Sequence, residues 1–308
     1  MSRLYRISHQ SVRKTSTSAS QKWGNIPSLP NDSLSTFRTH AFELSKPFLL
    51  PKGSFAGIPA IQKWFTPSSS ATSPPLTLNY DYLKQYGDTM LPLEYTVNDP
   101  QSPSSTFQRG PAPLALFLSW VAIATAPASA DSPQNVTGSR LYLAQAPLAA
   151  LPAALHNDLP IPEYVAKAGK ADVYDSDLWI GVPPTYTPLH KDPNPNLFVQ
   201  LAGCKRVRLL EPGVGDDVFE RVKVGLRQES GDGHTEGSKT FRGEEMMKGE
   251  ERRLLEDTVW DKRETSSGCE GLEAELEAGD GMFIPQGWWH SIKGVGGGVT
   301  ASVNWWFR

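Results

Sequence analysis

The sequence predicts a mainly β fold with flanking helices, arranged as a sandwich or barrel of the jelly-roll type. From about residue 175 onward, short apolar or alternating runs follow one another with turn residues between them, as in all-β folds. Glycine and proline each number 26 among 308 residues, which favours many turns over a helical bundle. Hydrophobic residues make up 39% of the chain and charged residues 20%, so a sizeable core is expected and global disorder is excluded.

Two helices and one strand are expected in the N-terminal half. The uncharged stretch from Pro111 to Ala130 is long enough to span a membrane, but three prolines interrupt it, which favours a buried helix near Leu114–Ala124. A short helix is expected over Tyr80–Gly87 and a strand over Met90–Val97. Two segments have the composition of low-complexity linkers, namely Thr66–Pro75 and Asn98–Thr106.

Six strands are expected in the C-terminal half, most of them bounded by glycine- or proline-containing turns, such as Pro183–Pro188 after the first strand. They are Leu178–Val182, Leu197–Leu201, Val207–Leu210, Leu272–Glu277, Gly281–Ile284 and Val299–Phe307. The segment Gly213–Gly271 is polar, dense in both charge signs and partly helical in character, which predicts a surface insertion. The expected organisation is a tail over 1–35 and one domain over 36–308. That domain has an N-terminal α/β part at 36–170, a barrel core at 171–308 and the polar insertion at 213–271.

The first 31 residues contain five arginines and lysines, many serines, and no aspartate or glutamate. This composition is typical of a mitochondrial transit peptide, and a basic disordered tail is the alternative. A mitochondrial location is therefore expected, with a cytoplasmic or nuclear one if the segment is only a tail. The whole chain carries a net charge of −3, which gives no general electrostatic reason to bind nucleic acid.

Any metal site has to use histidine and carboxylate ligands, because two cysteines cannot form a structural zinc cluster. His190 and Asp192 have H-x-D spacing, and side chains two residues apart share one face of an extended strand. His290 follows an apolar strand and a Pro-Gln-Gly turn. An isolated H-x-D pair is more often a surface histidine beside a solvated aspartate. The strands around this pair favour instead the two-histidine, one-carboxylate triad of non-haem Fe(II) oxygenases.

Several passages resemble the Jumonji-C (JmjC) oxygenases. The core of that family is similar to TPLHKDPNPNLFVQLAGCKRVRLLEP, its later strands to GDGMFIPQGWWH and SVNWWF, and its upstream part to RLYLAQAPLA and LPIPEY. The likeness extends from Leu44 to the C-terminus without the expected insertion, and it is strongest to the small protein-hydroxylase branch. It implies a double-stranded β-helix barrel of the cupin type that uses Fe(II), 2-oxoglutarate and O2.

Carried over by position, the resemblance implies that His190, Asp192 and His290 bind Fe(II). It also implies that Lys205 pairs with the distal carboxylate of 2-oxoglutarate, and a dicarboxylate does need a fixed cation at its far end. On its own, Lys205 would be read as an ordinary turn lysine. Further 2-oxoglutarate partners implied by the family are Thr187, Asn196 and Tyr142, and implied substrate-pocket residues are Phe198, Asn304 and Trp306.

Strand alternation supports part of this assignment. Asn196 and Phe198 are two residues apart, as are Asn304 and Trp306, so each pair shares a strand face. Thr187 lies at an odd offset from His190, so alternation does not place it inward and its assignment rests on the resemblance. Tyr142 lies far upstream, where a core tyrosine is the common alternative.

The resemblance implies hydroxylation of a protein or peptide side chain, with succinate and CO2 as coproducts. N-methyl-lysine demethylation and tRNA-base hydroxylation by the same mechanism are alternatives. A nucleic-acid partner is disfavoured because no basic stretch is interleaved with aromatic residues, and two cysteines cannot build a zinc-finger reader of chromatin. A membrane partner is not expected.

A non-catalytic cupin-like binding module is the alternative from another class. Loss of a metal-ligating residue would indicate such a module, and none of the three is missing from the sequence. Some similar hydroxylases dimerise through helices that follow the barrel, whereas this chain ends directly after SVNWWFR. The sequence therefore predicts a monomer.

Overall fold

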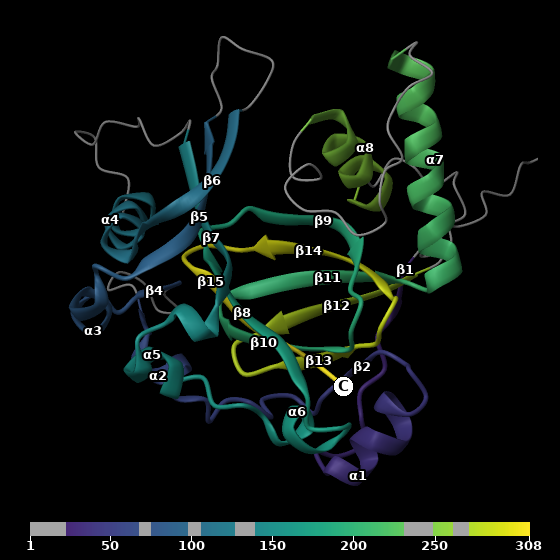
Figure 1. The fold of residues 1–308 in the computed structure, drawn as a ribbon, viewed down its shortest axis with the longest axis horizontal. Coiled ribbons are helices and arrows are strands. Elements are labelled where there is room, and N and C mark those ends of the chain that lie inside the picture. The colour runs from purple at the N-terminus through teal and green to yellow at the C-terminus, as the bar shows by residue number, and fades with distance from the viewer. Residues whose placement is uncertain (1–22, 68–74, 98–105, 127–138, 231–248, 261–270) are drawn as a thin grey trace, which may run out of the picture.

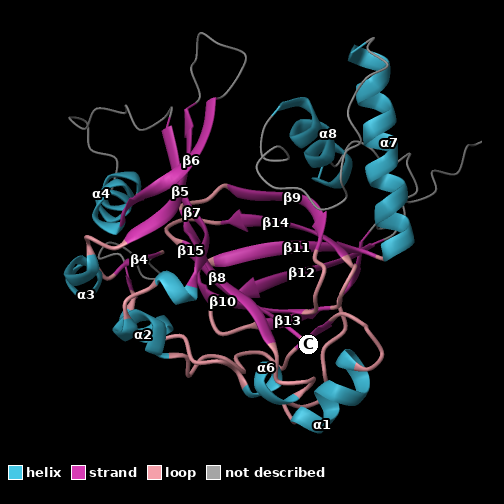
Figure 2. Cartoon of the chain, in the orientation of Figure 1, coloured by secondary structure: helices cyan, strands magenta, loops and turns pink. Residues whose placement is uncertain are grey.

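The fold is described from a computed structural model, over residues 23–67, 75–97, 106–126, 139–230, 249–260 and 271–308. Much of the tail or transit peptide expected over 1–35 lies outside these residues, as do most of the two expected linkers and parts of the expected insertion. Two β-sheets form the centre of the described part, and helices lie at its periphery (Figures 1 and 2).

The larger sheet has the strand order β2-β13-β10-β15-β8-β7-β5-β6 among the described residues, and every neighbouring pair is antiparallel. Its strands are β2 (Phe48–Leu49), β5 (Met90–Val97), β6 (Thr106–Pro113), β7 (Ser139–Pro147), β8 (Val173–Gly181), β10 (Asn196–Ala202), β13 (Gly281–Ile284) and β15 (Thr300–Phe307). All seven residues of β10 are buried, because the sheet is covered on both faces at this strand.

The smaller sheet has the order β1-β12-β11-β14-β9 in the residues that the structure describes, so that β9 is an edge strand there. Its strands are β1 (Trp23–Asn25), β9 (Thr185–Lys191), β11 (Cys204–Leu210), β12 (Gly271–Glu277) and β14 (Trp289–Val295). Only β1 runs parallel to its neighbour, β12. A separate hairpin pairs β3 (Phe65–Pro67) with β4 (Leu76–Leu78).

Most helices cover the face of the larger sheet that points away from the smaller one. They are α1 (Leu34–Phe37), η1 (Arg38–Phe42), α2 (Pro59–Lys63), α3 (Tyr80–Leu83), η2 (Lys84–Tyr86), α4 (Leu114–Ala124), η3 (Leu148–Ala150), α5 (Ala153–Asn157) and α6 (Glu163–Lys167). Buried side chains of these helices, such as Phe37 and Phe117, form one hydrophobic core with outward-facing strand residues such as Val303 and Trp305. None of the helices among the described residues is long and apolar enough to cross a membrane.

A second core lies between the two sheets. Phe198 of the larger sheet packs there with Val207 and Ile292 of the smaller one. A third core joins the outer face of the smaller sheet to α7 (Pro212–Ser230) and α8 (Gly249–Trp260), two helices within the expected insertion. In Figure 1 the two helices lie on the side of the barrel next to β9.

The mainly β jelly-roll fold predicted from the sequence is confirmed. The predicted helix Leu114–Ala124 and the strands Met90–Val97 and Gly281–Ile284 have the same bounds in the structure, and the other predicted strands differ by up to five residues at an end. The turn expected around Pro183–Pro188 was wrong, because this segment runs into β9. Strand β9 tolerates Pro188 because it is an edge strand, where a missing N–H does not break a ladder on both sides.

Candidate metal centre

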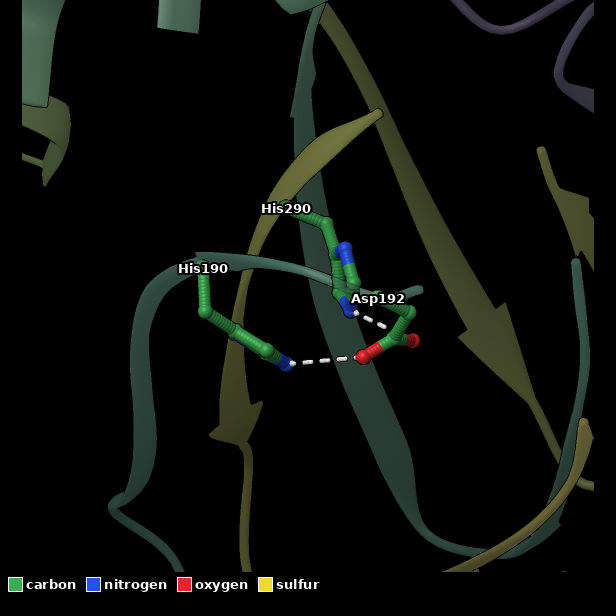
Figure 3. Close-up of side chains that lie close together, drawn as sticks. All are labelled: His190, Asp192 and His290. Atoms are coloured by element: carbon green, nitrogen blue, oxygen red, sulfur yellow. Dashed lines mark ion pairs between the residues drawn. The ribbon is translucent and has the colours of Figure 1, made fainter. Parts of the chain in front are cut away.

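The two candidate histidine ligands lie opposite each other on neighbouring strands. His190 of β9 and His290 of β14 are register partners, and Asp192 follows directly after β9. One ligand atom from each of the three residues lies within 4.8 Å of the others. In Figure 3 the two imidazoles converge on the carboxylate of Asp192. His290 Nε2 lies 3.5 Å from one carboxylate oxygen and His190 Nε2 lies 3.8 Å from the other.

Backbone contacts select the tautomer of both histidines. Nδ1 of His190 lies 2.9 Å from the carbonyl oxygen of Pro188, and Nδ1 of His290 lies 3.2 Å from that of Trp288. Because a carbonyl oxygen can only accept, each Nδ1 carries the hydrogen and donates it. The lone pair of each Nε2 is thereby directed toward Asp192, which is the arrangement that a metal ion requires.

Asp192 is held in place by two neutral donors. Its Oδ2 accepts hydrogen bonds from Nε1 of Trp306 at 2.8 Å and from Nδ2 of Asn196 at 3.0 Å. The amide of Asn196 is oriented in turn by Asn304, whose Nδ2 donates to its Oδ1 at 2.9 Å. These donors engage Oδ2, and Oδ1 is the oxygen that faces His190. The carboxylate can therefore offer Oδ1 to a metal as a single, oriented ligand atom.

The charge states of Asp192 and His290 also suit a metal. Burial alone would raise the pKa of Asp192, but the two histidines and the hydrogen bonds from Trp306 and Asn196 outweigh it and lower the pKa. Burial, with a smaller contribution from His190, lowers the pKa of His290 to about 4. Near neutral pH the site thus presents a carboxylate and a neutral imidazole at His290, the forms that bind divalent metals. Two histidines and one carboxylate fit Fe(II).

A cavity opens beside the three ligands, and the seven other residues singled out from the sequence all line it. They are Tyr142, Thr187, Asn196, Phe198, Lys205, Asn304 and Trp306. Sequence reasoning missed three further lining residues, namely Trp179, Ile292 and Ser302. Ser302 could have been predicted from the sequence, since it lies two residues before Asn304 and shares its strand face.

Thr187 reaches the cavity through an irregularity in β9. His190 pairs with His290, whereas Thr187 pairs with Ile292, so the register shifts between these positions. Three residue steps on β9 therefore oppose two on β14, which defines a β-bulge. The bulge brings Thr187 and His190 to the same face despite their odd separation. Simple alternation, which left Thr187 without an inward place, fails here for this reason.

Lys205 supplies a buried positive charge to the cavity. It lies on β11, is 2% exposed, and its Nζ donates to Oγ of Ser302 at 2.6 Å. Burial lowers the pKa of Lys205 to about 7, and no carboxylate among the described residues forms an ion pair with it. A buried ammonium with a hydroxyl partner is poorly satisfied on its own. The donor set therefore fits an anionic ligand that ends beside Lys205.

Tyr142 and Trp179 form an aromatic wall of the cavity. Their rings lie 6.0 Å apart between centroids, and burial raises the pKa of the Tyr142 hydroxyl, which keeps it protonated as a donor. The indole N–H of Trp179 is buried and has no hydrogen-bond partner among the described residues. Because Trp179 also borders the cavity, a bound ligand or water could accept this hydrogen bond.

A jelly-roll barrel with a largely buried two-histidine, one-carboxylate site beside a lysine is the arrangement typical of cupin-type metal proteins. The chain belongs to the cupin-like domain family, which matches residues 35–308. JmjC members of this family are typically iron- and 2-oxoglutarate-dependent oxygenases. The resemblance to JmjC proteins found in the sequence is thereby confirmed.

Several JmjC proteins are similar to this chain. Jumonji C domain-containing protein 5 of Drosophila melanogaster is 28% identical over 92% of the chain and 60% of its own length. Lysine-specific demethylase JMJ30 of Arabidopsis thaliana is 26% identical over 54% of the chain and 33% of its length. Lysine-specific demethylase 8 of Xenopus tropicalis is 26% identical over 54% of the chain and 32% of its length. The chain therefore matches only part of each of these longer relatives.

Proposed function

We propose that this protein is an Fe(II)- and 2-oxoglutarate-dependent dioxygenase that hydroxylates a side chain of a protein or peptide. The observation that carries the proposal is the position of Lys205. A buried ammonium with no carboxylate partner among the residues described lines the same cavity as His190 and His290. A metal triad alone fits many metals and reactions. A fixed cation set apart from it fits a dicarboxylate that reaches from one to the other.

Each residue has a defined task in this proposal. His190, Asp192 and His290 hold Fe(II), and Lys205 receives the distal carboxylate of 2-oxoglutarate. Thr187 and Tyr142 line the path between them and offer hydroxyl donors, while Asn196 keeps the carboxylate of Asp192 oriented.

Fe(II), when bound, supplies the activation of O2 that couples conversion of 2-oxoglutarate to succinate and CO2 with hydroxylation of a C–H bond. The protein contributes geometry and the exclusion of water. Phe198, Trp179 and Trp306 enclose the cavity with aromatic surface. Asn304 and Trp306 lie next to Asp192 in the hydrogen-bond network, so they are placed to contact the substrate as well as the metal ligands.

Demethylation of N-methyl-lysine is the second candidate. Two of the similar proteins are named lysine-specific demethylases, and hydroxylation of an N-methyl group releases the methyl group as formaldehyde. The two reactions leave different marks on the substrate, because hydroxylation adds one oxygen atom and demethylation removes one methylene unit.

The first test is succinate formation from 2-oxoglutarate by the purified chain, with and without Fe(II). Succinate that depends on Fe(II) and disappears in His190→Ala is expected, because that variant lacks one of three ligands. Undiminished turnover in His190→Ala would overturn the proposal. A peptide library read by mass spectrometry then separates the two candidates: a gain of oxygen supports hydroxylation, and formaldehyde with loss of a methylene unit supports demethylation.

A further inference from the structure

The residues that alternate with the metal ligands face the outside of the barrel, where α7 and α8 lie. Lys191 is the residue between His190 and Asp192, and Trp289 is the residue before His290. Lys191 and Trp289 are register partners across β9 and β14. A group that bonds to both of them from outside therefore contacts the chain neighbours of all three candidate ligands.

Asp216 in the first turns of α7 is such a group. Its Oδ1 accepts a hydrogen bond from Nζ of Lys191 at 2.7 Å and another from Nε1 of Trp289 at 3.0 Å. The ammonium of Lys191 also lies 5.0 Å from the centroid of the Trp289 ring. One carboxylate oxygen therefore joins the two strands that carry the ligands.

The helix is fitted closely to this position. A Cβ atom on Gly215 would lie only 2.1 Å from Cδ1 of Trp289, so glycine is needed for the helix to approach the indole. One helical turn further on, the ring of Phe219 lies 5.1 Å from that of Trp289. Trp289 is 1% exposed. The position of Asp216 is thus determined by packing on either side of it.

A second contact from α8 supports the same two strands. Nε1 of Trp260 donates to Oγ of Ser291 at 2.8 Å, and that hydroxyl donates to the carbonyl oxygen of Thr187 at 2.9 Å. Ser291 is fully buried and follows His290 directly. Both neighbours of His290 in the chain are therefore bonded to the α7–α8 pair.

We propose that Asp216 is a positioning residue for the metal centre. Within the described part of the chain, strand β9 has a neighbour on one side only and carries a β-bulge close to His190, so the sheet by itself constrains it weakly. Asp216 bonds Lys191 to Trp289 and thereby holds β9 against β14. A shift of β9 would displace two of the three ligands together, which lowers metal affinity. The role rests on the proposed function, since it serves the site that would hold Fe(II).

The test measures metal affinity directly, with Mn(II) as a redox-stable probe and the full chain in a calorimeter. Asp216→Ala is expected to weaken Mn(II) binding about tenfold, the size usual for groups that orient ligands. The matched control is Asp217→Ala, an exposed aspartate on the same helix turn, which is expected to bind Mn(II) as the wild type does. Lys191→Met removes one end of the bridge and is expected to act through the same route. The double variant that combines Asp216→Ala with Lys191→Met should then lose less free energy of Mn(II) binding than the sum of the two single losses.

Each outcome decides the question. Equal Mn(II) affinity in Asp216→Ala and the wild type would overturn the positioning role. If Asp216→Ala does not fold, Asp216→Asn is used instead. This variant keeps an acceptor for Trp289 and loses the charge that pairs with Lys191. An Mn(II) affinity equal to that of the wild type would again overturn the role. A wild-type chain that binds no Mn(II) would overturn the metal centre and the role with it. A wild-type chain that binds Mn(II) but forms no succinate with Fe(II) would overturn the proposed function. The Mn(II) affinities of Asp216→Ala and the wild type would still decide the positioning role.

Discussion

The ammonium of Lys205 lies 2.6 Å from the hydroxyl of Ser302, inside the barrel and beside the candidate metal ligands. The hydroxyl accepts a hydrogen bond but carries no charge that could offset the ammonium. A buried charge with such a partner lowers the stability of the free protein, and it becomes favourable only when an anion arrives. The charge is therefore costly in the free protein and useful in the complex, and three predictions about Lys205 follow.

Replacing Lys205 by methionine should stabilise the ligand-free protein and abolish 2-oxoglutarate binding. Methionine fills a similar volume without a charge, and the gain in the free energy of unfolding at pH 7 is expected to be on the order of 1–3 kcal/mol. Thermal unfolding with and without 2-oxoglutarate measures both effects. Lys52→Met is the matched control, because the side chain of Lys52 is 78% exposed and no change in stability is expected. A destabilised Lys205→Met variant that still gains stability from 2-oxoglutarate would contradict the role of Lys205.

The stability difference between wild type and Lys205→Met should depend on pH. The pKa of Lys205 is about 7 in the folded protein because of burial, and it is near 10.4 in the unfolded chain. Between these values the unfolded state binds more protons, so the wild type gains stability as pH rises through this window. The advantage of the methionine variant is therefore largest at pH 7 and below, and it shrinks toward pH 10. Urea unfolding at pH 6.5, 8 and 9.5 would show this trend, and a difference that does not vary with pH would contradict it.

Binding of 2-oxoglutarate should weaken above pH 7 for the same reason. Only the charged lysine attracts the distal carboxylate, and its population in the free protein falls above the pKa of about 7. The association constant is expected to fall by up to about tenfold per pH unit until the pKa of the bound state is reached. Titration of 2-oxoglutarate into the Mn(II)-loaded chain measures it. Mn(II) affinity measured at each pH is the control, and a 2-oxoglutarate affinity that stays constant to pH 9 would exclude Lys205 as the partner.

The sequence was sufficient for the parts of the site that depend on spacing along one strand. His190 with Asp192, Asn196 with Phe198, and Asn304 with Trp306 are each two residues apart, and period-two alternation places each pair on one face. His290 could be proposed from its place after an apolar strand and a turn, but its position opposite His190 depends on the register of β9 and β14. Thr187 could not be placed by alternation, since a β-bulge is a property of the register between two strands.

Contacts that arise from packing of separate segments were beyond the sequence. Asp216 lies in a polar helix, and no periodicity in that helix indicates that its carboxylate reaches Trp289. Trp179 falls within a predicted strand, but its place in the cavity depends on pairing opposite Ser302, which needs the register of β8 and β15. The fold class was accessible because turn residues and strand periodicity are local signals.

The close approach of α7 to Trp289 gives a prediction about Gly215. Gly215→Ala adds a Cβ where Trp289 already lies, so the helix or the indole must shift, and destabilisation of about 1–3 kcal/mol is expected. Gly213→Ala is the matched control in the same helix, because a Cβ there meets no atom within 4 Å. Higher helix propensity should leave that variant neutral or slightly stabilised. Chemical denaturation of the two variants provides the comparison, and equal free energies of unfolding would show that the helix does not pack closely against Trp289.

Trp306 and Trp305 offer a matched pair that isolates the hydrogen bond to Asp192. Nε1 of Trp306 donates to Oδ2 of Asp192 at 2.8 Å, whereas Nε1 of the buried Trp305 has no hydrogen-bond partner in the described part of the chain. Phenylalanine at either position keeps an aromatic ring and removes the N–H. Trp306→Phe is expected to weaken Mn(II) binding about tenfold, because Asp192 loses one of the two donors that orient its carboxylate.

Trp305→Phe should behave differently on both measurements. It removes volume from the core on the far face of the sheet, so it should lower the free energy of unfolding by about 1–3 kcal/mol while leaving Mn(II) affinity unchanged. Calorimetric titration and thermal unfolding of both variants separate the two effects. If Trp306→Phe bound Mn(II) as tightly as the wild type, the indole would serve packing alone. Asn196, whose Nδ2 donates to the same carboxylate oxygen, would then be the donor that orients Asp192.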